Sequence, residues 1–195
     1  MPPGEFFFTE GFVRYAEGIT LTPLEAEDRE QFILDNQAAF KYGATEEFGL
    51  RDDHFEEEGE IISRGTIEHS IDGGCAYRIR QNGRIVGGMV LRIDEATQHN
   101  ELELLFVSPS AHSRGIGAAA WREAERLYPD TVVWETCTPY FETRNIHFYI
   151  NKCGFAAVEF FCPGHPDPHF PEEFQGSDFG GEDQGMMFRF EKRMR

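Results

Sequence analysis

Long hydrophobic runs are absent from this 195-residue sequence. No stretch approaches the roughly 20 consecutive apolar residues that a transmembrane helix needs. The N-terminal segment MPPGEFFFTEGF also lacks the basic start and the long apolar run of a signal peptide. We therefore expect a cytoplasmic protein that does not act within a membrane.

Paired cysteines are absent as well. The four cysteines are Cys75, Cys137, Cys153 and Cys162. They form no CxxC pair and show no metal-ligand spacing, so we expect scattered, buried free thiols. The segment HPDPH carries His165, Asp167 and His169, which could in principle ligate a metal. Its two prolines and the surrounding Gly- and Pro-rich residues favour an exposed loop instead, so we expect no metal site.

Positive charge is scarce. The 35 acidic residues outnumber the 18 basic ones, and the formal net charge is −17. A field of this sign repels nucleic acids and anionic membranes, whereas it tolerates a cationic substrate such as an amine. The acidic segment 44–60 is most simply a solvated face, and a rim that attracts amines is the alternative.

The sequence does have enough apolar material for one folded domain. Aromatic residues make up 14% of the chain, including 19 phenylalanines, and a chain of this length buries a substantial core. We expect an N-terminal extension over 1–17 and a single domain over 18–195. Segment 163–185, rich in Gly and Pro, is predicted to be a loop, and loops this long are usually functional or disordered.

The periodicity of apolar residues predicts six or seven strands and about four helices. The Asn82-Gly83 pair between two alternating runs is the strongest short-range signal of a β-hairpin. In chain order the expected elements are a strand at 18–23, helices at 23–43 and 55–71, a hairpin at 76–94, a strand at 100–107, a helix within 108–127, a strand at 131–137, a helix at 142–154, and strands at 156–162 and 186–194. Runs of strands followed by crossover helices indicate an α/β (α+β) fold with a mixed sheet.

Two glycines stand where the helix in SPSAHSRGIGAAAWREAERL, residues 108–127, should begin. Because a glycine within a helix costs roughly 1 kcal/mol relative to alanine, Gly115 and Gly117 need a reason. They could allow close packing of the helix on the sheet. They could also admit a phosphate group to the backbone N–H groups at the helix N-terminus.

A dinucleotide site is the first phosphate-binding alternative. Gly115, Gly117 and Ala120 match its G-x-G-x-x-A pattern, and Glu135 follows about 20 residues on, at the next strand. However, the seven residues SPSAHSR separate Val107 from Gly115, whereas in that fold the first glycine follows its strand almost at once. The Asn-Gly hairpin also does not belong to parallel βαβ units, so we expect a different ligand.

The pattern LLFVSP followed by HSRGIG resembles the main motif of the GCN5-related N-acetyltransferases (GNAT), which bind acyl-coenzyme A. A second motif of that family, an Asn a few residues before a Tyr and then Gly-Phe, is present as NIHFYINKCGF. Both motifs stand in the family's order on the expected elements, and the resemblance covers roughly residues 18–160. His112 departs from the pattern, since the family usually has Gln or Arg there.

The resemblance implies the acyl-CoA N-acyltransferase fold, whose mostly antiparallel sheet is splayed by a bulge between the strands expected at 100–107 and 131–137. It also implies how acetyl-CoA, the cosubstrate, is bound. The backbone of the first strand would pair with the pantetheine arm, and the glycine loop would hold the pyrophosphate. The residues expected to contact the coenzyme are Leu105, Phe106, Val107, His112, Ser113, Arg114, Gly115, Ile116, Gly117, Ala118, Asn145 and Tyr149.

Acetyl transfer to an amine needs a base for the amine and an acid for the departing thiolate. Tyr149 is the candidate acid, because a phenol with a pKa near about 10 stays protonated at neutral pH. Glu101 and Glu103 lie two apart on one strand and share a face, so either could draw the amine's proton through water. An ordered water alone is the alternative.

We therefore expect an N-acetyltransferase that moves the acetyl group of acetyl-CoA to a primary amine by direct transfer in a ternary complex. The alternative is a non-catalytic module of the same fold that binds acyl-CoA or forms an interface. Segment 44–60, the strand at 100–107 and loop 163–185 are expected to contact the acceptor, and the loop to cover it. The sequence identifies neither the acceptor nor the oligomeric state, for which a homodimer is one alternative.

Overall fold

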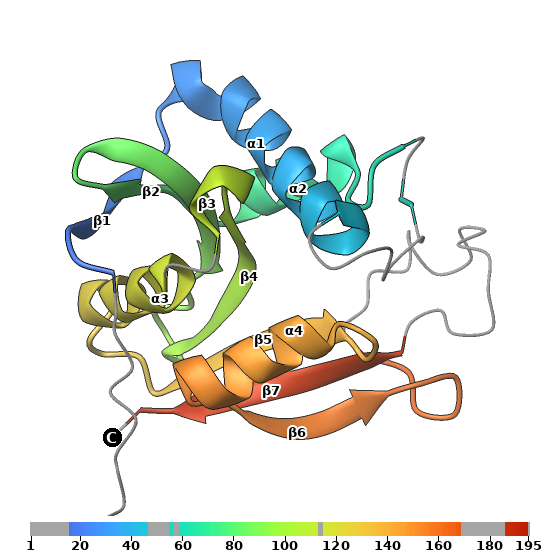
Figure 1. The fold of residues 1–195 in the computed structure, drawn as a ribbon. Helices are drawn as coiled ribbons and strands as arrows, with labels where there is room; N and C mark the ends of the chain where they lie inside the picture. The colour runs from blue at the N-terminus through green and yellow to red at the C-terminus, as the bar shows by residue number, and fades with distance from the viewer. Residues whose placement is uncertain (1–15, 47–54, 57–58, 113–114, 169–185, 195) are drawn as a thin grey trace, which may run out of the picture.

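The computed structural model describes residues 16–46, 55–56, 59–112, 115–168 and 186–194. Their centre is one sheet of seven strands in the order β1-β2-β3-β4-β5-β7-β6 (Figure 1). The strands are β1 (Ile19–Pro23), β2 (Cys75–Gln81), β3 (Arg84–Arg92), β4 (His99–Val107), β5 (Val133–Pro139), β6 (Ala156–Phe161) and β7 (Met187–Arg193). Among the strands that the structure describes, only β4 and β5 run parallel to each other. The mixed, mostly antiparallel sheet predicted from the sequence is confirmed.

Helices cover both faces of this sheet (Figure 1). One face carries α1 (Arg29–Lys41) and α2 (Arg64–Gly73), and the other carries α3 (Ile116–Leu127) and α4 (Thr143–His147). A π-helical turn, Phe148–Cys153, continues α4, so the helix predicted at 142–154 is confirmed. Among the described residues, no helix is long and apolar enough to span a membrane.

Two local signals decide where elements begin. The predicted hairpin turns at Asn82-Gly83, where both residues have positive φ, 51° and 81°, as a tight two-residue turn requires. The second helix begins at Arg64 rather than at the predicted residue 55. Its start is capped by Ser63, whose hydroxyl accepts a hydrogen bond from the Thr66 N–H at 3.0 Å. The described residues between 55 and 62 are not helical.

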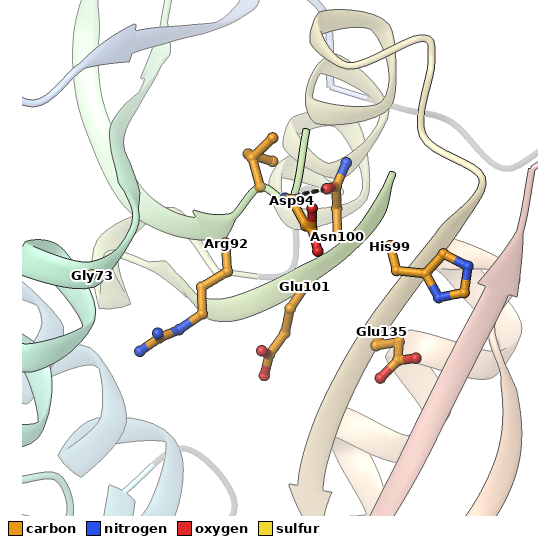
Figure 2. Close-up of a pocket in the computed structure, with 8 residues that line it drawn as sticks. Gly73, Arg92, Asp94, His99, Asn100, Glu101 and Glu135 are labelled. Carbon is orange, nitrogen blue, oxygen red and sulfur yellow. Dashed lines mark hydrogen bonds between the residues drawn. The ribbon is translucent and has the colours of Figure 1, made fainter. Parts of the chain in front are cut away.

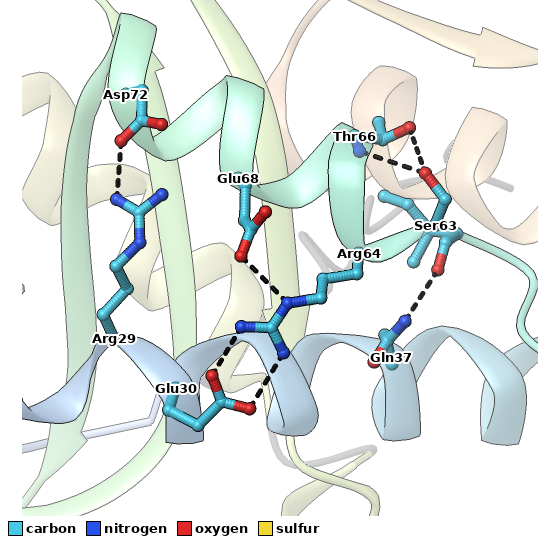
Figure 3. A network of polar contacts seen from close by, with 9 residues as sticks. Arg29, Glu30, Gln37, Ser63, Arg64, Thr66, Glu68 and Asp72 are labelled. Atoms are coloured by element: carbon cyan, nitrogen blue, oxygen red, sulfur yellow. Dashed lines mark hydrogen bonds and ion pairs between the residues drawn. The ribbon is translucent and has the colours of Figure 1, made fainter.

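Ion pairs join α1 to α2 (Figure 3). Arg64 on α2 binds both carboxylate oxygens of Glu30 on α1, at 2.8 and 2.5 Å, and also pairs with Glu68 one turn further along α2. Nearer the end of α2, Arg29 donates to Asp72 at 2.6 Å. Because these pairs are exposed, each stabilises the fold little, but together they favour one arrangement of the two helices.

A β-bulge interrupts β4 at Glu103. Val90 on β3 pairs with Leu104, and the next residue, Leu91, pairs with Leu102, so Glu103 has no partner of its own on β3. The extra residue reverses the alternation of side chains. Leu102 packs in the apolar cluster under α3, whereas Leu104 packs in the cluster under α1 and α2.

The strands β4 and β5 pair over only three positions, which end at Glu101 opposite Glu135. Just beyond, the Thr136 hydroxyl donates to the Leu102 carbonyl at 2.8 Å. After the bulge, β4 curves away from β5 (Figure 1). The splay implied by the resemblance is therefore confirmed. We call the diverging parts of these strands, 104–107 and 136–139, the fork.

A buried arginine holds α1 on the sheet. Arg78 on β2 has a side chain only 1% exposed, and its guanidinium donates to Asp28 at 2.6 and 2.9 Å and to Asp35 at 2.8 Å. It also lies 5.1 Å from the centre of the Phe32 ring. Asp28 directly precedes α1 and Asp35 lies within it. A buried charge is costly unless it is paired, so the position of α1 depends on this cluster.

We predict that Arg78→Met lowers the free energy of unfolding by about 3 kcal/mol, because it leaves two partly buried carboxylates beside an apolar side chain. Urea denaturation at pH 7 measures the change. Arg84→Met, at the exposed start of β3, is the matched control and should change stability by less than about 0.5 kcal/mol. An Arg78→Met protein as stable as the wild type would mean that apolar packing alone holds α1.

Candidate active site

The backbone of β4 offers hydrogen-bonding groups to the fork. The Ser108 N–H donates to the Val86 carbonyl at 2.8 Å, and Phe106 lies two residues earlier on the same antiparallel ladder. Because hydrogen-bonded pairs alternate along such a ladder, the N–H and C=O of Phe106 point to β3. Those of Leu105 and Val107 point the other way, into the fork. Of the three strand residues predicted to pair with the coenzyme, two therefore present their backbone there.

The side chains of these three residues belong to the packed interior. The Phe106 ring meets the Phe32 ring edge to face, with centroids 5.1 Å apart. Leu105 and Val107 are partly buried against the cluster under α3. Any contact that this strand makes in the fork through these residues is thus a backbone contact, which carries little side-chain specificity.

The glycine loop leads into α3. Gly115 directly precedes the helix with φ +72°, a left-handed conformation that glycine adopts readily. A Cβ added at Gly117 would lie 3.2 Å from the Phe148 ring, so this glycine lets α3 approach the π-helical turn. Ile116 and Ala118 are buried, and the backbone N–H groups of the helix start are left for capping. The predicted contacts Ser113 and Arg114 lie outside the described residues.

His112 turns back to the end of β4. Its Nε2 lies 2.6 Å from the carbonyl oxygen of Val107. Its ring meets the Tyr42 ring edge to face, with centroids 5.4 Å apart. Tyr42 begins the π-helical turn Tyr42–Glu46 that follows α1. The imidazole predicted to lie near the coenzyme therefore contacts the protein's own backbone at the edge of the fork.

Tyr149 lies on the β5 side of the fork, in the π-helical turn after α4. Its half-buried ring packs against Phe190, with centroids 5.6 Å apart. Burial raises the pKa of the Tyr149 hydroxyl to about 12, and a hydrogen bond with Thr136 opposes this rise. Asn145, four residues earlier, donates to the Thr138 hydroxyl at 3.3 Å. Both predicted side chains thus meet β5 where it parts from β4, and Tyr149 keeps its proton at neutral pH.

The two candidate bases have different surroundings. Glu103 accepts hydrogen bonds from Arg92 at 2.8 and 2.9 Å and from the Ser70 hydroxyl at 2.9 Å. Within the described part of the chain, no group donates a hydrogen bond to Glu101. Burial and then the Glu103 carboxylate raise the pKa of Glu101, and Arg92 offsets this only in part. An unbonded carboxylate with a raised pKa is a better base than one held by an arginine.

Glu101 borders a cavity of about 350 Å³ at the base of the fork (Figure 2). Figure 2 shows Arg92 and Glu101 extending to the same side from β3 and β4, with Glu135 across from them on β5. Arg189 pairs with Glu135 at 3.2 Å. The lining residues are Gly73, Arg92, Ile93, Asp94, His99, Asn100, Glu101 and Glu135. They include three carboxylates and one arginine, so the cavity favours a cationic ligand.

Sequence reasoning missed Arg92 and Ser70, which hold Glu103. It noted Glu135 only as part of a dinucleotide pattern. Arg92 lies opposite Glu101 on the β3–β4 ladder. The hairpin turn was a signal for this register, because it places Arg92 at the end of the strand that neighbours 100–107. Ser70 comes from α2, and no short-range pattern connects it with β4.

Some of the other predicted features lie partly outside the residues that the structure describes. Among the described residues, no group of three side chains could hold a metal ion. In the HPDPH segment, His165 Nε2 lies 2.8 Å from the Glu159 carboxylate, and His169 lies outside the described residues. The described residues also exclude 169–185 of the predicted covering loop, and 47–54 and 57–58 of the acidic segment.

Comparison with known proteins adds to this geometry. Residues 33–155 match the model of the acetyltransferase (GNAT) family. YrkN, an uncharacterized protein of Bacillus subtilis (strain 168), is 44% identical over 170 residues, which cover 86% of this chain and 89% of that protein. A Bacillus subtilis acetyltransferase solved in complex with CoA is 15% identical with a TM-score of 0.59, over 91% of this chain and 98% of that one. A spermidine N-acetyltransferase (SpeG K23-Q34 chimera from Vibrio cholerae and hSSAT) is 14% identical with a TM-score of 0.62. The match covers 90% of this chain and 95% of that one.

We predict that Glu101→Gln raises the melting temperature at pH 7, whereas Glu103→Gln lowers it. Because the pKa of Glu101 is raised in the folded state, folding favours its protonated form, and stability falls as the pH rises from about 4 through the folded pKa. Glutamine removes the cost of the ionised carboxylate. Glu103→Gln weakens charge-assisted hydrogen bonds to Arg92 and costs about 1 to 2 kcal/mol.

Calorimetry at pH 4 and pH 7 measures both variants. The gain from Glu101→Gln should shrink towards zero near pH 4, where the carboxyl group is largely protonated in the folded state. A Glu101→Gln protein that is less stable than the wild type at pH 7 would contradict the described surroundings of this carboxylate.

Proposed function

Because this chain belongs to the acetyltransferase (GNAT) family, we propose that it transfers the acetyl group of acetyl-CoA to a primary amine by direct transfer in a ternary complex. The observation that carries the proposal is the fork. It brings the backbone of Leu105 and Val107, the unbonded Glu101 and the protonated Tyr149 to the place where β4 and β5 diverge. These are the parts needed to hold a thioester and to move protons around it.

The residues present fit the coenzyme. The N–H and C=O groups that Leu105 and Val107 direct into the fork suit the amide groups of a pantetheine arm, as a neighbouring strand would. The start of α3 suits the pyrophosphate, because Gly115 and Gly117 carry no Cβ and the helix dipole favours an anion. The B. subtilis acetyltransferase solved with CoA has the same fold, which supports this assignment.

Glu101 acts as the base. It takes the proton of the amine through a water molecule as the amine nitrogen bonds to the thioester carbon and the carbonyl electrons move to oxygen. When the carbon–sulfur bond then breaks, the acetyl group stays on nitrogen as an amide and the sulfur leaves as a thiolate. Arg92 holds Glu103 and keeps that carboxylate out of the reaction.

Tyr149 stabilises the departing sulfur. With a pKa of about 12, its hydroxyl is a weaker acid than a free thiol, whose pKa is about 8.5. Complete proton transfer to the thiolate is therefore uphill. Tyr149 instead donates a hydrogen bond as negative charge develops on the sulfur, and water supplies the proton that the thiolate finally takes.

The state of the Cys137 thiol, on the β5 side of the fork, favours direct transfer. Burial and the carboxylate of Glu101 raise the pKa of Cys137, on β5, to about 12. Since the thiolate and not the thiol is the nucleophile, Cys137 is a poor candidate for an acetylated intermediate at neutral pH.

The acceptor is proposed to be a primary amine because the cavity beside Glu101 is lined by carboxylates. Asp94, Glu101 and Glu135 all border it. Such a lining raises the local concentration of ammonium ions, from which the base removes a proton. The structural neighbour named for spermidine acts on a molecule of this class. Release of free CoA from acetyl-CoA with a panel of polyamines, amino acids, peptides and aminoglycosides tests the function. Binding of acetyl-CoA without turnover on any amine would contradict it.

We predict that Tyr149→Phe lowers kcat about 10- to 100-fold and leaves the KM for acetyl-CoA within about twofold, since the hydroxyl acts mainly on charge that develops in the transition state. Initial rates of CoA release measure both constants. Tyr128→Phe is the control, because the Tyr128 hydroxyl pairs with that of Tyr77 at the far end of α3. Equal loss in both variants would remove the role of Tyr149.

We also predict that Glu101→Gln lowers kcat/KM about 100-fold and abolishes the acidic limb of its pH profile. In the wild type that limb should lie above the ordinary glutamate pKa, since the pKa of Glu101 is raised. Glu103→Gln should retain the limb with only a few-fold loss of rate. If Glu103→Gln instead abolished the acidic limb and Glu101→Gln retained it, Glu103 would be the base.

A further inference from the structure

The last carbonyl of β4 is occupied by a side chain of the same chain. Val107 directs its N–H and C=O into the fork, and the His112 ring places Nε2 at 2.6 Å from that carbonyl oxygen. A carbonyl oxygen can only accept, so Nε2 carries the proton and donates it. At this distance the hydrogen bond is short for a nitrogen donor.

The chain between these two residues is itself held by hydrogen bonds. After the Ser108 N–H binds the Val86 carbonyl on β3, the Ala111 N–H donates to the Ser108 carbonyl at 2.8 Å. Ala111 is buried in the cluster under α3. This single helical turn, Pro109–Ala111, brings His112 back to the strand that it has just left. The imidazole is therefore presented to Val107 by a loop with little freedom.

Tyr42 confines the imidazole from the side of α1. Its ring meets His112 edge to face at 70°, and it belongs to the π-helical turn that follows α1. The contact joins the helical layer over one face of the sheet to the loop that leads to α3. Aromatic pairs of this geometry are favourable beyond the area that they bury.

We propose that His112 is a positioning residue for the coenzyme arm, a role that rests on the proposed function. The N–H and C=O of one residue in an antiparallel strand point to the same side but belong to successive peptide planes, so a bond to the Val107 carbonyl restrains the residue whose N–H faces the arm. Val107 ends β4, and among the described residues no strand pairs with it in the fork. The Ser108 N–H anchors this peptide to β3, and His112 restrains its carbonyl on the fork side. Without His112 that second restraint is lost, and the arm meets a less ordered partner.

The proposal also sets how the arm pairs. His112 takes one of the two lone pairs of the Val107 carbonyl, which favours the carbonyl of Leu105 as the acceptor for the arm's amide N–H. The Val107 N–H then donates to an amide oxygen of the arm. The side chain of His112 thus acts through the backbone and needs no contact with a phosphate.

Calorimetric titration of the full-length chain tests the role with two probes. One is CoA, and the other is adenosine 3′,5′-bisphosphate, which lacks the arm. His112→Leu should weaken CoA binding about 5- to 10-fold, the worth of one hydrogen bond, and leave binding of the bisphosphate within about twofold. His112→Gln, whose amide N–H can still donate to Val107, should bind both probes within about twofold of the wild type.

Tyr42→Leu is the second variant, because it loosens the imidazole and keeps its donor. It should weaken CoA binding about two- to fourfold and spare the bisphosphate. With saturating acetyl-CoA and amine, all three variants should keep kcat within about twofold, since His112 and Tyr42 touch no reacting atom. A melting temperature for each variant shows that it is folded.

The outcomes separate the two proposals. A wild-type chain that binds no CoA overturns the proposed function and this role with it. A wild-type chain that binds CoA, with His112→Leu binding it equally well, overturns only the role of His112. Equal weakening of CoA and bisphosphate, or no rescue by His112→Gln, also overturns it, because a general disturbance of the loop would then explain the loss.

Discussion

The short pairing between β4 and β5 is the constraint on which the rest of the structure depends. Three ladder positions join the two parts of the sheet, and the bulge at Glu103 then turns β4 away. In the part of the chain that the structure describes, no strand pairs with the backbone groups that Leu105 and Val107 direct into the fork, which costs free energy wherever water is excluded. A fold keeps such a defect when it is functional. Under the proposed function, a ligand with amide groups completes the sheet here, and the chemistry follows from where that ligand ends.

The electrostatics of the site follow from the same three positions. Parallel pairing sets Glu101 beside Glu135, and the bulge brings Glu103 close to both β3 and α2. Carboxylates this close together destabilise the fold unless cationic side chains pair with them. Arg92 pairs with Glu103, and Arg189 pairs with Glu135. Among the described residues no group donates a hydrogen bond to Glu101, and its pKa is raised. Under the proposed function, Glu101 is the carboxylate suited to act as a base, and an incoming ammonium ion lowers the cost of its negative charge.

Short-range patterns predicted the elements, and the family resemblance predicted where they diverge. The Asn82-Gly83 turn and the alternating runs around it needed no tertiary information, because turn geometry fixes them locally. The choice between Glu101 and Glu103 could not be made in this way. Two-residue spacing places both on one face, and a bulge within β4 together with an arginine from β3 separates their roles. The start of α2 was misplaced because the acidic run before Ser63 looks helical until its cap is seen.

The two motifs also meet in a way that their spacing along the chain hides. Gly117 is the second residue of α3 and Phe148 lies in the π-helical turn, yet a Cβ on Gly117 would press on the Phe148 ring. The absent side chain lets the segment that carries Tyr149 approach α3, and under the proposed function it also clears the backbone for a phosphate. Phosphate binding and close packing were competing explanations in the sequence, and the structure makes them compatible. A glycine under both constraints is expected to tolerate even alanine poorly, because relief of one contact does not relieve the other.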